Sequence, residues 1–360
     1  MAADILVERI AVRPYLRGAG RWLTVLVFLA AAGCNGDDRQ AGQSPRDGQA
    51  TGGTLRVFMA DSLARPFAAL GEAFKTANPG VRLVQIPAGS VLSTRKLTHG
   101  NDQADVLAVA DYMVLDELLR PAGLGDWYIC FATNTIVIAH TDMSAGGTQL
   151  TADNWFDVLA EPQTKVQAAN PYHDPCGYWT ELSWKLADLH YPATAGGGSI
   201  WQKMTDKCGP AKDRRSDSQE LLRLVETAGG IDYAFVYRSQ AMLHNLPFLA
   251  LPAQINMGDP AHVDFYRQVS IQLPGKASGQ TIDKRGDAIV FAVTMPRTVK
   301  PDREKLALGY IAFMLSDKGQ AVLTEQYLTM FDKPFTFDLA NVPEPLRHGL
   351  ATRSRPDAGS

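Results

Sequence analysis

Strand-like and helix-like segments alternate along residues 54–119, and this alternation limits the folds open to the chain more than any other feature. In the first helical segment, apolar side chains recur every three or four residues at Phe67, Leu70 and Phe74, until Asn78-Pro79-Gly80 ends it. Strands that alternate with helices assemble into a parallel sheet covered by helices, which is an α/β fold. The predicted segments are strand 54–59, helix 63–77, strand 81–86, a short helix from Ser90, strand 104–109 and helix 112–119.

The same alternation restarts after residue 140. It follows a long buried strand predicted over 131–140 and comprises helix 154–159, strand 166–169, helices 178–189 and 218–228, and strand 233–236. A further buried strand at 288–294 precedes one or two helices over 302–330. Because these last helices have no strands of their own, we expect the chain to return to the first sheet rather than to form two independent domains in sequence.

This order predicts two α/β lobes joined by two hinge strands, with a ligand cleft between the lobes. The first lobe is expected to comprise residues 54–135 and 285–340, and the second lobe residues 136–284. Residues 341–360 are expected to form a loose C-terminal tail, because they are rich in Pro, Arg, Ser and Gly. Proteins of this architecture close around a small ligand by hinge motion, so the arrangement favours a solute-binding protein.

The first 33 residues have the pattern of a secretory signal peptide. Arg13, Arg17 and Arg21 precede the apolar run Trp22–Ala32, whose 11 residues are too few for a transmembrane helix, which needs about 20. The run ends at Ala31-Ala32-Gly33-Cys34, which resembles the lipobox of bacterial lipoproteins, with Ala31 in place of the usual Leu. We expect lipidation of Cys34 after cleavage; the alternative is a plain secretory signal with an incidental cysteine.

Residues 34–53 are rich in Gly, Asp, Gln and Ser and contain almost no apolar side chains. Such a segment cannot bury enough surface to fold, so it is predicted to be a flexible tether. A lipid anchor followed by a tether holds a globular body outside the cytoplasm. The predicted location is therefore the periplasm or the cell surface, with Cys34 attached to the membrane.

A disulfide is predicted between Cys176 and Cys208. Cys34 is assigned to the anchor, and Cys130 lies in the apolar run Trp127–Phe131, which is typical of a buried core strand. The other two cysteines lie in polar, turn-rich sequence, and export permits disulfides. Closing this loop of about 32 residues would stabilise the fold by roughly 3–4 kcal/mol; the alternative is three free thiols. No Cys/His spacing indicates a metal site.

Several classes of function are disfavoured by the sequence. The net charge of -3, with Lys and Arg dispersed along the chain, gives no basis for nucleic-acid binding. The motifs G-x-S-x-G, H-E-x-x-H and the P-loop do not occur. His173 stands beside Asp174, but adjacent residues of an extended loop point to opposite sides. No catalytic residue, cofactor or metal is therefore predicted, although an enzyme, a sensor or a purely structural lipoprotein on this fold remains the alternative.

Four loops follow strand-like segments, at the edge where open α/β sheets bind ligands. In two of them a serine, Ser62 or Ser90, begins a helix, and a helix N-terminus offers N–H groups and a positive dipole end to an anion. Gly89 lets the backbone approach a ligand, and Tyr237 can donate its phenol hydroxyl. The alternatives are helix capping for each serine and a position at the core edge for Tyr237. The loops are 60–63, 88–90, 172–178 and 237–239.

Five stretches together resemble a known family. The most specific is Asp174-Pro175-Cys176-Gly177-Tyr178, which matches a D-P-C-G-Y signature; the others are 88–91, 104–112, 127–134 and 232–239. Over about residues 54–335 the chain resembles the tungstate/molybdate-binding periplasmic substrate-binding proteins of ABC importers. The resemblance implies the type II periplasmic-binding-protein fold. It also implies that Ser62, Ser90, Asp174 and Tyr237 occupy the family's ligand-contacting positions.

Two departures from the family bear on the ligand. In one branch, two carboxylates coordinate the metal of the oxyanion; Asp174 matches the first, but Val236 stands where the second is expected. The family usually has Gly at the position of Asp61. Repulsion between an ionised Asp and a unit negative charge about 4 Å away costs about 4 kcal/mol at an effective dielectric constant of 20. This is about half of the binding free energy of a micromolar complex, which is about 8 kcal/mol in favour of binding.

Three interpretations of Asp61 remain. The side chain faces away and places an acid at a helix N-terminus, which is stabilising; or it coordinates the metal of an expanded oxyanion; or the ligand is not an oxyanion. In the third case, Asp61 and Asp174 would suit a cationic or hydroxyl-rich ligand.

The sequence thus predicts an extracytoplasmic solute-binding lipoprotein of an ABC importer that captures molybdate or tungstate, and not an enzyme. The expected partners are the small oxyanion, the membrane permease of the transporter and, through the lipid anchor, the membrane. The protein is expected to be a monomer. The alternative is the same fold with a ligand that is not an oxyanion.

Overall fold

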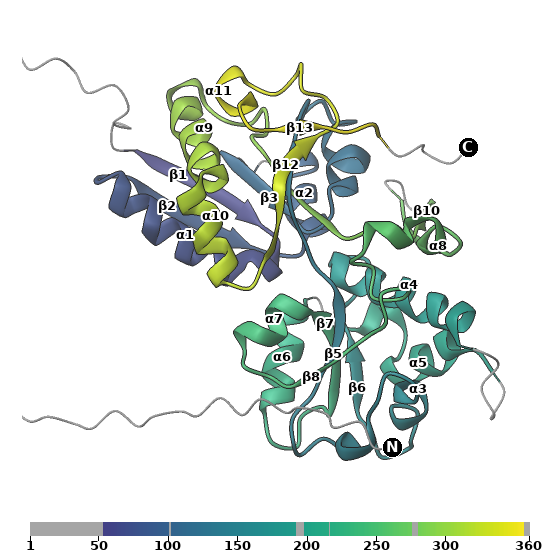
Figure 1. Cartoon of the computed structure of the whole chain (residues 1–360). Helices are drawn as coiled ribbons and strands as arrows, with labels where there is room; N and C mark the ends of the chain where they lie inside the picture. The colour runs from purple at the N-terminus through teal and green to yellow at the C-terminus, as the bar shows by residue number, and fades with distance from the viewer. Residues whose placement is uncertain (1–52, 101, 192–197, 216, 276–279, 356–360) are drawn as a thin grey trace, which may run out of the picture. The chain divides into compact units, whose positions relative to one another are not determined.

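The computed structural model describes residues 53–100, 102–191, 198–215, 217–275 and 280–355. The predicted signal peptide, the lipidation site Cys34 and all of the predicted tether except residue 53 lie outside these ranges. The described residues form two larger β-sheets with helices on their faces, together with one hairpin (Figure 1). No helix in these ranges is long and apolar enough to cross a membrane.

The first sheet has seven strands in the order β13-β12-β4-β11-β3-β1-β2. β1 pairs in parallel with β2 and β3, as the alternation of strands and helices predicts. β11 lies between β3 and β4 and runs antiparallel to both, so residues late in the chain complete this sheet. The strands are β1 (Thr54–Met59), β2 (Arg82–Pro87), β3 (Val106–Val109), β4 (Ile129–Thr133), β11 (Val290–Thr294), β12 (Thr329–Thr336) and β13 (Ala351–Thr352).

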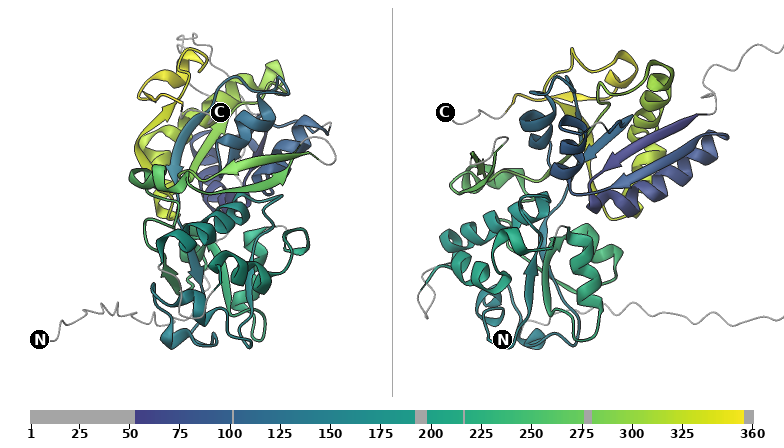
Figure 2. Two further views of the ribbon diagram at one scale, coloured as in Figure 1. Left: turned by 90° about the vertical axis from the view of Figure 1, so that its right-hand side faces the viewer. Right: turned by 180° about the vertical axis from the view of Figure 1, so that it is seen from behind.

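Helices cover both faces of the first sheet. Successive residues of a strand point to opposite faces, and apolar residues of β1 are buried on both of them. Leu55 and Val57 of β1 pack in one core cluster with Phe67 of α1 and Tyr310 of α9. Phe58 packs in a second cluster, which contains residues of α2 and η2. We call this sheet with its helices the first lobe (Figure 2). The helices are α1 (Ala64–Ala77), α2 (Ser90–Thr98), the helical turn η2 (Leu115–Leu119), α9 (Pro301–Leu315) and α10 (Asp317–Glu325).

The second sheet has four strands in the order β6-β7-β5-β8 and, with its helices, forms the second lobe. Phe235 of β7 packs with Trp155 of α3 and Trp184 of α4 on one face. Val236 packs on the other face with Leu221 of α6. The strands are β5 (Ile136–Ala139), β6 (Val166–Ala168), β7 (Tyr233–Tyr237) and β8 (Phe248–Ala250), and the helices are α3 (Trp155–Val158), α4 (Pro175–His190), α5 (Ile200–Cys208), α6 (Ser218–Glu226) and α7 (Arg238–Leu243).

The chain first passes between the two sheets at Asn134–Thr135, so the prediction of one long strand over 131–140 is wrong. β4 belongs to the first sheet and β5 to the second. The Asn134 side chain donates from Nδ2 to Ser239 Oγ (2.7 Å) and accepts from the Thr135 backbone N–H (3.0 Å). Such side-chain bonds compete with strand pairing. The strand is therefore interrupted at Asn134, although the apolar sequence continues through it.

The second passage between the sheets contains a hairpin that was not predicted from the sequence pattern. β9 (Ser270–Pro274) pairs antiparallel with β10 (Thr281–Arg285), after the short helix α8 (Val263–Tyr266). Lys185 of α4 donates to the carbonyl oxygen of Ser270 (2.7 Å), so the hairpin lies against the second lobe. β10 is rich in polar and charged residues, and this composition hid the strand.

Residues 341–355 form regular structure, which corrects the prediction of a loose tail there. They contain α11 (Glu344–Arg347) and β13, which pairs in parallel with β12. Val342 and Leu346 are buried in the core of the first lobe. Two apolar anchors thus hold a segment whose overall composition resembles a tail. Residues 356–360 lie outside the described ranges.

The predicted Cys176–Cys208 disulfide is absent, since both residues are free, buried thiols. Cys176 lies in the first turn of α4, where its Sγ approaches the carbonyl oxygen of Phe235 (3.8 Å). Cys208 ends α5 within the core, and burial raises its pKa to about 12. The polar sequence around these cysteines was misleading, because both side chains face inward. Cys130 is buried in β4, as predicted.

Candidate functional site

Loops of the two lobes touch at Gly89, which lies between β2 and α2. A Cβ atom on Gly89 would lie 2.2 Å from the carbonyl oxygen of His173 and 3.4 Å from the Cα of Asp174. Only a residue without a side chain permits this approach. The structure therefore brings two of the four predicted loops into direct backbone contact, one from each lobe.

Ser62 and Tyr237 each bury a hydroxyl that has no hydrogen-bond partner among the described residues. Ser62 is 3% exposed and Tyr237 is fully buried. Ser62 does not act as a cap, because no side chain caps the turn η1 (Asp61–Leu63). A buried hydroxyl without a partner costs about 1–3 kcal/mol. Burial raises the pKa of Tyr237 well above its ordinary value, so its hydroxyl keeps the proton that it can donate.

Ser90 offers a third hydroxyl at the first residue of α2. Its Oγ accepts a hydrogen bond from the backbone N–H of Ala110 (2.9 Å), just beyond β3. This bond uses a lone pair, and no acceptor for the hydroxyl proton is present in the described part of the chain. Ser90 is fully buried, so the side chain is held in place with its donor function unused.

Asp174 joins the N-termini of two helices. Its Oδ1 accepts from the Cys176 N–H (2.9 Å) at the start of α4, and its Oδ2 accepts from the Ser218 N–H (3.1 Å) at the start of α6. Burial raises the pKa of Asp174 to about 6 in spite of these two bonds. The side chain thus has a positioning role in the second lobe, and direct contact with a ligand stays a prediction.

Asp61 lies immediately before Ser62, and its carboxyl accepts no hydrogen bond within the described ranges. Burial, then the carboxylates of Asp174 and Asp217, raise the pKa of Asp61 to about 8, while Lys96 acts in the opposite direction. Asp61 therefore lies within electrostatic reach of acidic groups of the second lobe. At neutral pH its carboxyl is mostly protonated. A neutral carboxyl does not repel an anion, so the electrostatic cost expected for an ionised Asp61 does not arise.

A buried polar cluster beside these loops was not predicted from the sequence. Its centre is Asp111, which binds Tyr178 of α4 and Lys284 of β10. Asp111 and Tyr178 both fall in stretches that support the family resemblance, and this was the only available signal. Nothing in the sequence marked Lys284, which is 173 positions from Asp111.

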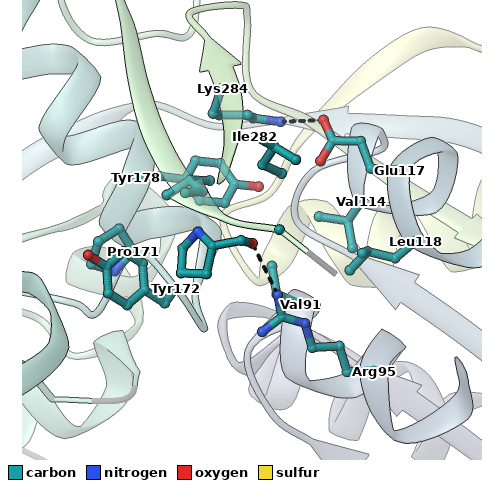
Figure 3. Close-up of a pocket in the computed structure, with 13 residues that line it drawn as sticks. Val91, Arg95, Val114, Glu117, Leu118, Pro171, Tyr172, Tyr178, Ile282 and Lys284 are labelled. Atoms are coloured by element: carbon teal, nitrogen blue, oxygen red, sulfur yellow. Dashed lines mark hydrogen bonds and ion pairs between the residues drawn. The ribbon is translucent and has the colours of Figure 1, made fainter. Parts of the chain in front are cut away.

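A small pocket of about 60 Å³ adjoins this cluster (Figure 3). Tyr178, Lys284 and Glu117 line one side, and Arg95 of α2 lies on another. The rest of the lining is mostly apolar and comes from α2, residues 114–118, the 171–172 loop and the β9–β10 hairpin. None of the six predicted ligand-binding residues lines it, so this pocket is distinct from the region of the unpaired hydroxyls.

The described residues contain no group of three or more His, Cys, Asp or Glu side chains that could hold a metal ion. The predicted loops contain buried hydroxyls, backbone N–H groups at the start of α2 and two carboxyls with raised pKa values. Such a set can bind a ligand with several oxygen atoms by hydrogen bonds.

The model of one protein family, described as "Bacterial extracellular solute-binding protein", matches residues 55–328. The molybdate/tungstate-binding protein WtpA of Thermococcus kodakarensis is 32% identical over 92% of this chain and 96% of its own length. WtpA of Pyrococcus abyssi is 34% identical over 89% of this chain and 95% of its own length. An uncharacterized solute-binding protein of Petrotoga mobilis is 35% identical, covering 83% of this chain and 90% of its own length.

Solved structures share the fold at lower identity. The sulfate-binding protein SubI of Mycobacterium tuberculosis aligns with a TM-score of 0.55 and 14% identity, over 78% of this chain and 87% of its own. The periplasmic molybdate-binding protein of Azotobacter vinelandii aligns with a TM-score of 0.52 and 16% identity, over 76% and 98%. These likenesses confirm the type II periplasmic-binding-protein fold expected from the sequence.

Proposed function

This chain belongs to the family of bacterial extracellular solute-binding proteins, and we propose that it captures a tetrahedral oxyanion, molybdate or tungstate, between its lobes. Family members bind a small ligand outside the cytoplasm and deliver it to the membrane permease of an ABC importer. The two WtpA relatives, which are named for binding molybdate and tungstate, support the choice of ligand.

One observation carries the proposal: the unpaired, buried hydroxyls of Ser62 and Tyr237. One comes from each lobe, and both belong to the six residues predicted to bind the ligand. Ligand oxygens would accept from both hydroxyls and from Ser90, which would remove the penalty of about 1–3 kcal/mol for each unsatisfied group. The N-terminus of α2, at Gly89 and Ser90, adds backbone N–H groups and a favourable dipole for an anion.

Calorimetric titration of residues 54–360 with molybdate, tungstate, sulfate and phosphate tests the proposal. We expect sub-micromolar binding of molybdate or tungstate, and a loss of about tenfold or more in affinity in Ser62→Ala and in Tyr237→Phe. Tyr310→Phe is the matched control, because Tyr310 is also buried but packs against Phe74 of α1. Unchanged affinity in both site variants would refute the assignment of the hydroxyls.

A second candidate ligand is favoured by one observation, the acidic surroundings of Asp61. Asp174 and Asp217 both raise its pKa, whereas Lys96 lowers it. A cationic or hydroxyl-rich ligand would suit ionised carboxylates. Binding of a polyol or an organic cation, with no heat from any of the four anions, would establish this alternative on the same fold.

The protein is further proposed to be a monomeric, non-enzymatic lipoprotein anchored through Cys34, with lobes divided at about residues 135 and 285. The sequence pattern of residues 1–53 supports the anchor and the tether. Mass spectrometry of the membrane fraction should find acyl chains on Cys34. Release of wild-type protein into the soluble fraction, unchanged by Cys34→Ala, would contradict the anchor.

A further inference from the structure

Asp111 is a buried carboxylate of the first lobe whose side-chain partners come from distant segments. It follows β3 by two positions and is 1% exposed. Its Oδ2 accepts from Tyr178 Oη (2.6 Å) and from Lys284 Nζ (2.5 Å). Its Oδ1 accepts from the Met113 N–H (2.9 Å), which fixes the side chain within its own loop. One oxygen is therefore held by the first lobe, and the other is shared by two donors from outside it.

Lys284 is enclosed to the same degree, with its side chain 2% exposed. Its Nζ lies 5.0 and 5.1 Å from the ring centroids of Tyr178 and Trp179 and 3.7 Å from Glu117 Oε1 (Figure 3). Burial lowers the pKa of Lys284, but Asp111 and Glu117 outweigh it and hold the pKa above its ordinary value. The ammonium is thus charged at neutral pH and is stabilised by two carboxylates and two aromatic rings.

The donors and acceptors of this cluster divide between the lobes. Asp111 and Glu117 belong to the first lobe, whereas Tyr178 is part of α4 in the second lobe and Lys284 is on the hairpin that packs against α4. Movement of α4 away from β3 would break both bonds to Asp111 and leave buried charges without partners, which is strongly unfavourable.

The cluster also lies directly behind the ligand-binding loops. Asp111 adjoins Ala110, whose N–H binds Ser90 Oγ. Tyr178 is in the first turn of α4, the helix that Asp174 caps. The segments that carry Asp111 and Tyr178 therefore also support the loops that meet at Gly89, whereas Lys284 comes from β10.

We propose that Asp111, Tyr178 and Lys284 form a latch between the lobes, in which Asp111 is a positioning residue that keeps the binding loops together without touching the ligand. The inference rests on the proposed function where ligand affinity is measured. Because the apparent dissociation constant is the intrinsic one divided by the fraction of closed protein, loss of the latch weakens binding from a distance.

Tyr178→Phe removes one bond of the latch and keeps the aromatic ring. We expect the dissociation constant for the best-bound of the four anions to rise about tenfold or more, since hydrogen bonds to charged groups are the stronger class. The double variant Asp111→Asn/Lys284→Met removes both charges of the bond, and of the acidic groups near Lys284 it leaves Glu117 without this cation. It should show a rise of at least the same size. In small-angle X-ray scattering without ligand, both proteins should have a larger radius of gyration than the wild type.

Asp105→Asn is the matched control. Asp105 is equally buried and pairs with Arg303 (3.1 Å), but both residues belong to the first lobe. We expect a lower melting temperature with no change in affinity or radius of gyration.

Two results would overturn the latch: wild-type affinity and radius of gyration in Tyr178→Phe, or equal losses of affinity in Tyr178→Phe and Asp105→Asn. If the wild type binds none of the four anions, the proposed function fails and scattering alone decides the latch. A larger radius in the two latch variants than in the control then supports it, and equal radii refute it.

Discussion

Anion affinity should fall as the pH rises above neutrality, and Asp61 should be responsible. Its carboxyl has a pKa of about 8, raised by burial and then by Asp174 and Asp217, with Lys96 in partial opposition. Below that pH the group is a neutral acid that can donate a hydrogen bond to a ligand oxygen. Above it the group is a carboxylate, which repels an anion about 4 Å away by about 4 kcal/mol at an effective dielectric constant of 20.

The size of the effect follows from the titration. With a pKa of about 8, roughly nine-tenths of the protein has a neutral Asp61 at pH 7 and roughly one-tenth at pH 9. If only the neutral form binds, the dissociation constant rises about tenfold over this range, which corresponds to about 1.4 kcal/mol. Asp174, with a pKa of about 6, is already mostly ionised at pH 7 and contributes little to this change.

Calorimetric titration with molybdate at pH 7, 8 and 9 measures this dependence in the wild type and in Asp61→Asn. The amide has the size of the protonated acid and does not titrate, so the variant should bind with nearly constant affinity. A wild-type dissociation constant that is equal at pH 7 and pH 9 would refute the reasoning. So would a variant with the same slope as the wild type.

Three further outcomes are expected. Gly89→Ala places a Cβ 2.2 Å from a carbonyl oxygen of the facing loop, so it should force the lobes apart. Molybdate binding in the same titration should weaken about tenfold or more. Wild-type affinity in this variant would contradict the contact. Asp174→Ala removes the acceptor for two helix N-termini and should lower the free energy of unfolding by about 2 kcal/mol in urea; a change below 0.5 kcal/mol, by the same rule, would count against this role. Asp61→Asn should stabilise the ligand-free protein at pH 8.5 relative to the wild type and not at pH 4. Folding raises the pKa of this carboxyl from its ordinary value of 3.8 to about 8, so the wild type loses stability as the pH rises through this range. Equal melting temperatures of the two proteins at pH 8.5 would contradict the raised pKa.

Local sequence pattern was sufficient for the first elements of the first lobe, over residues 54–98. The strand predicted over residues 54–59 is confirmed as β1, and helix α1 begins one residue after the predicted start. Such segments contain their own periodicity and their own stop signals, so their structure depends little on distant residues. The loops that follow them could therefore be located, along with Ser62 and Ser90.

Features that depend on distant residues could not be predicted. The apolar run around Asn134 has one pattern, but a contact with Ser239, 105 positions away, divides it between two sheets. The polar setting of Cys176 concealed a side chain that faces the core. The bond between Asp111 and Lys284 joins the loop after β3 to strand β10 of the hairpin, and no local pattern encodes such a pair.

The ionisation of Asp61 shows the same limit at the candidate site. The sequence placed a carboxyl beside a serine that begins a helix, but it gave no information on burial or on the two acidic side chains nearby. Those surroundings decide whether the carboxyl is charged. Because these surroundings keep Asp61 protonated at neutral pH, an oxyanion can bind beside it. From the sequence alone, Asp61 was expected to repel such a ligand.

Equilibrium dialysis of residues 54–360 against molybdate at pH 7, with the metal measured by elemental mass spectrometry, tests whether the protein binds this oxyanion through Ser62 and Tyr237. We expect about one molybdenum atom to be retained per chain at micromolar concentration. Tungstate should displace it, excess phosphate should not, and the double variant Ser62→Ala/Tyr237→Phe should not retain it. Retention of no molybdenum by the wild type, or equal retention by the double variant, would contradict this mode of binding.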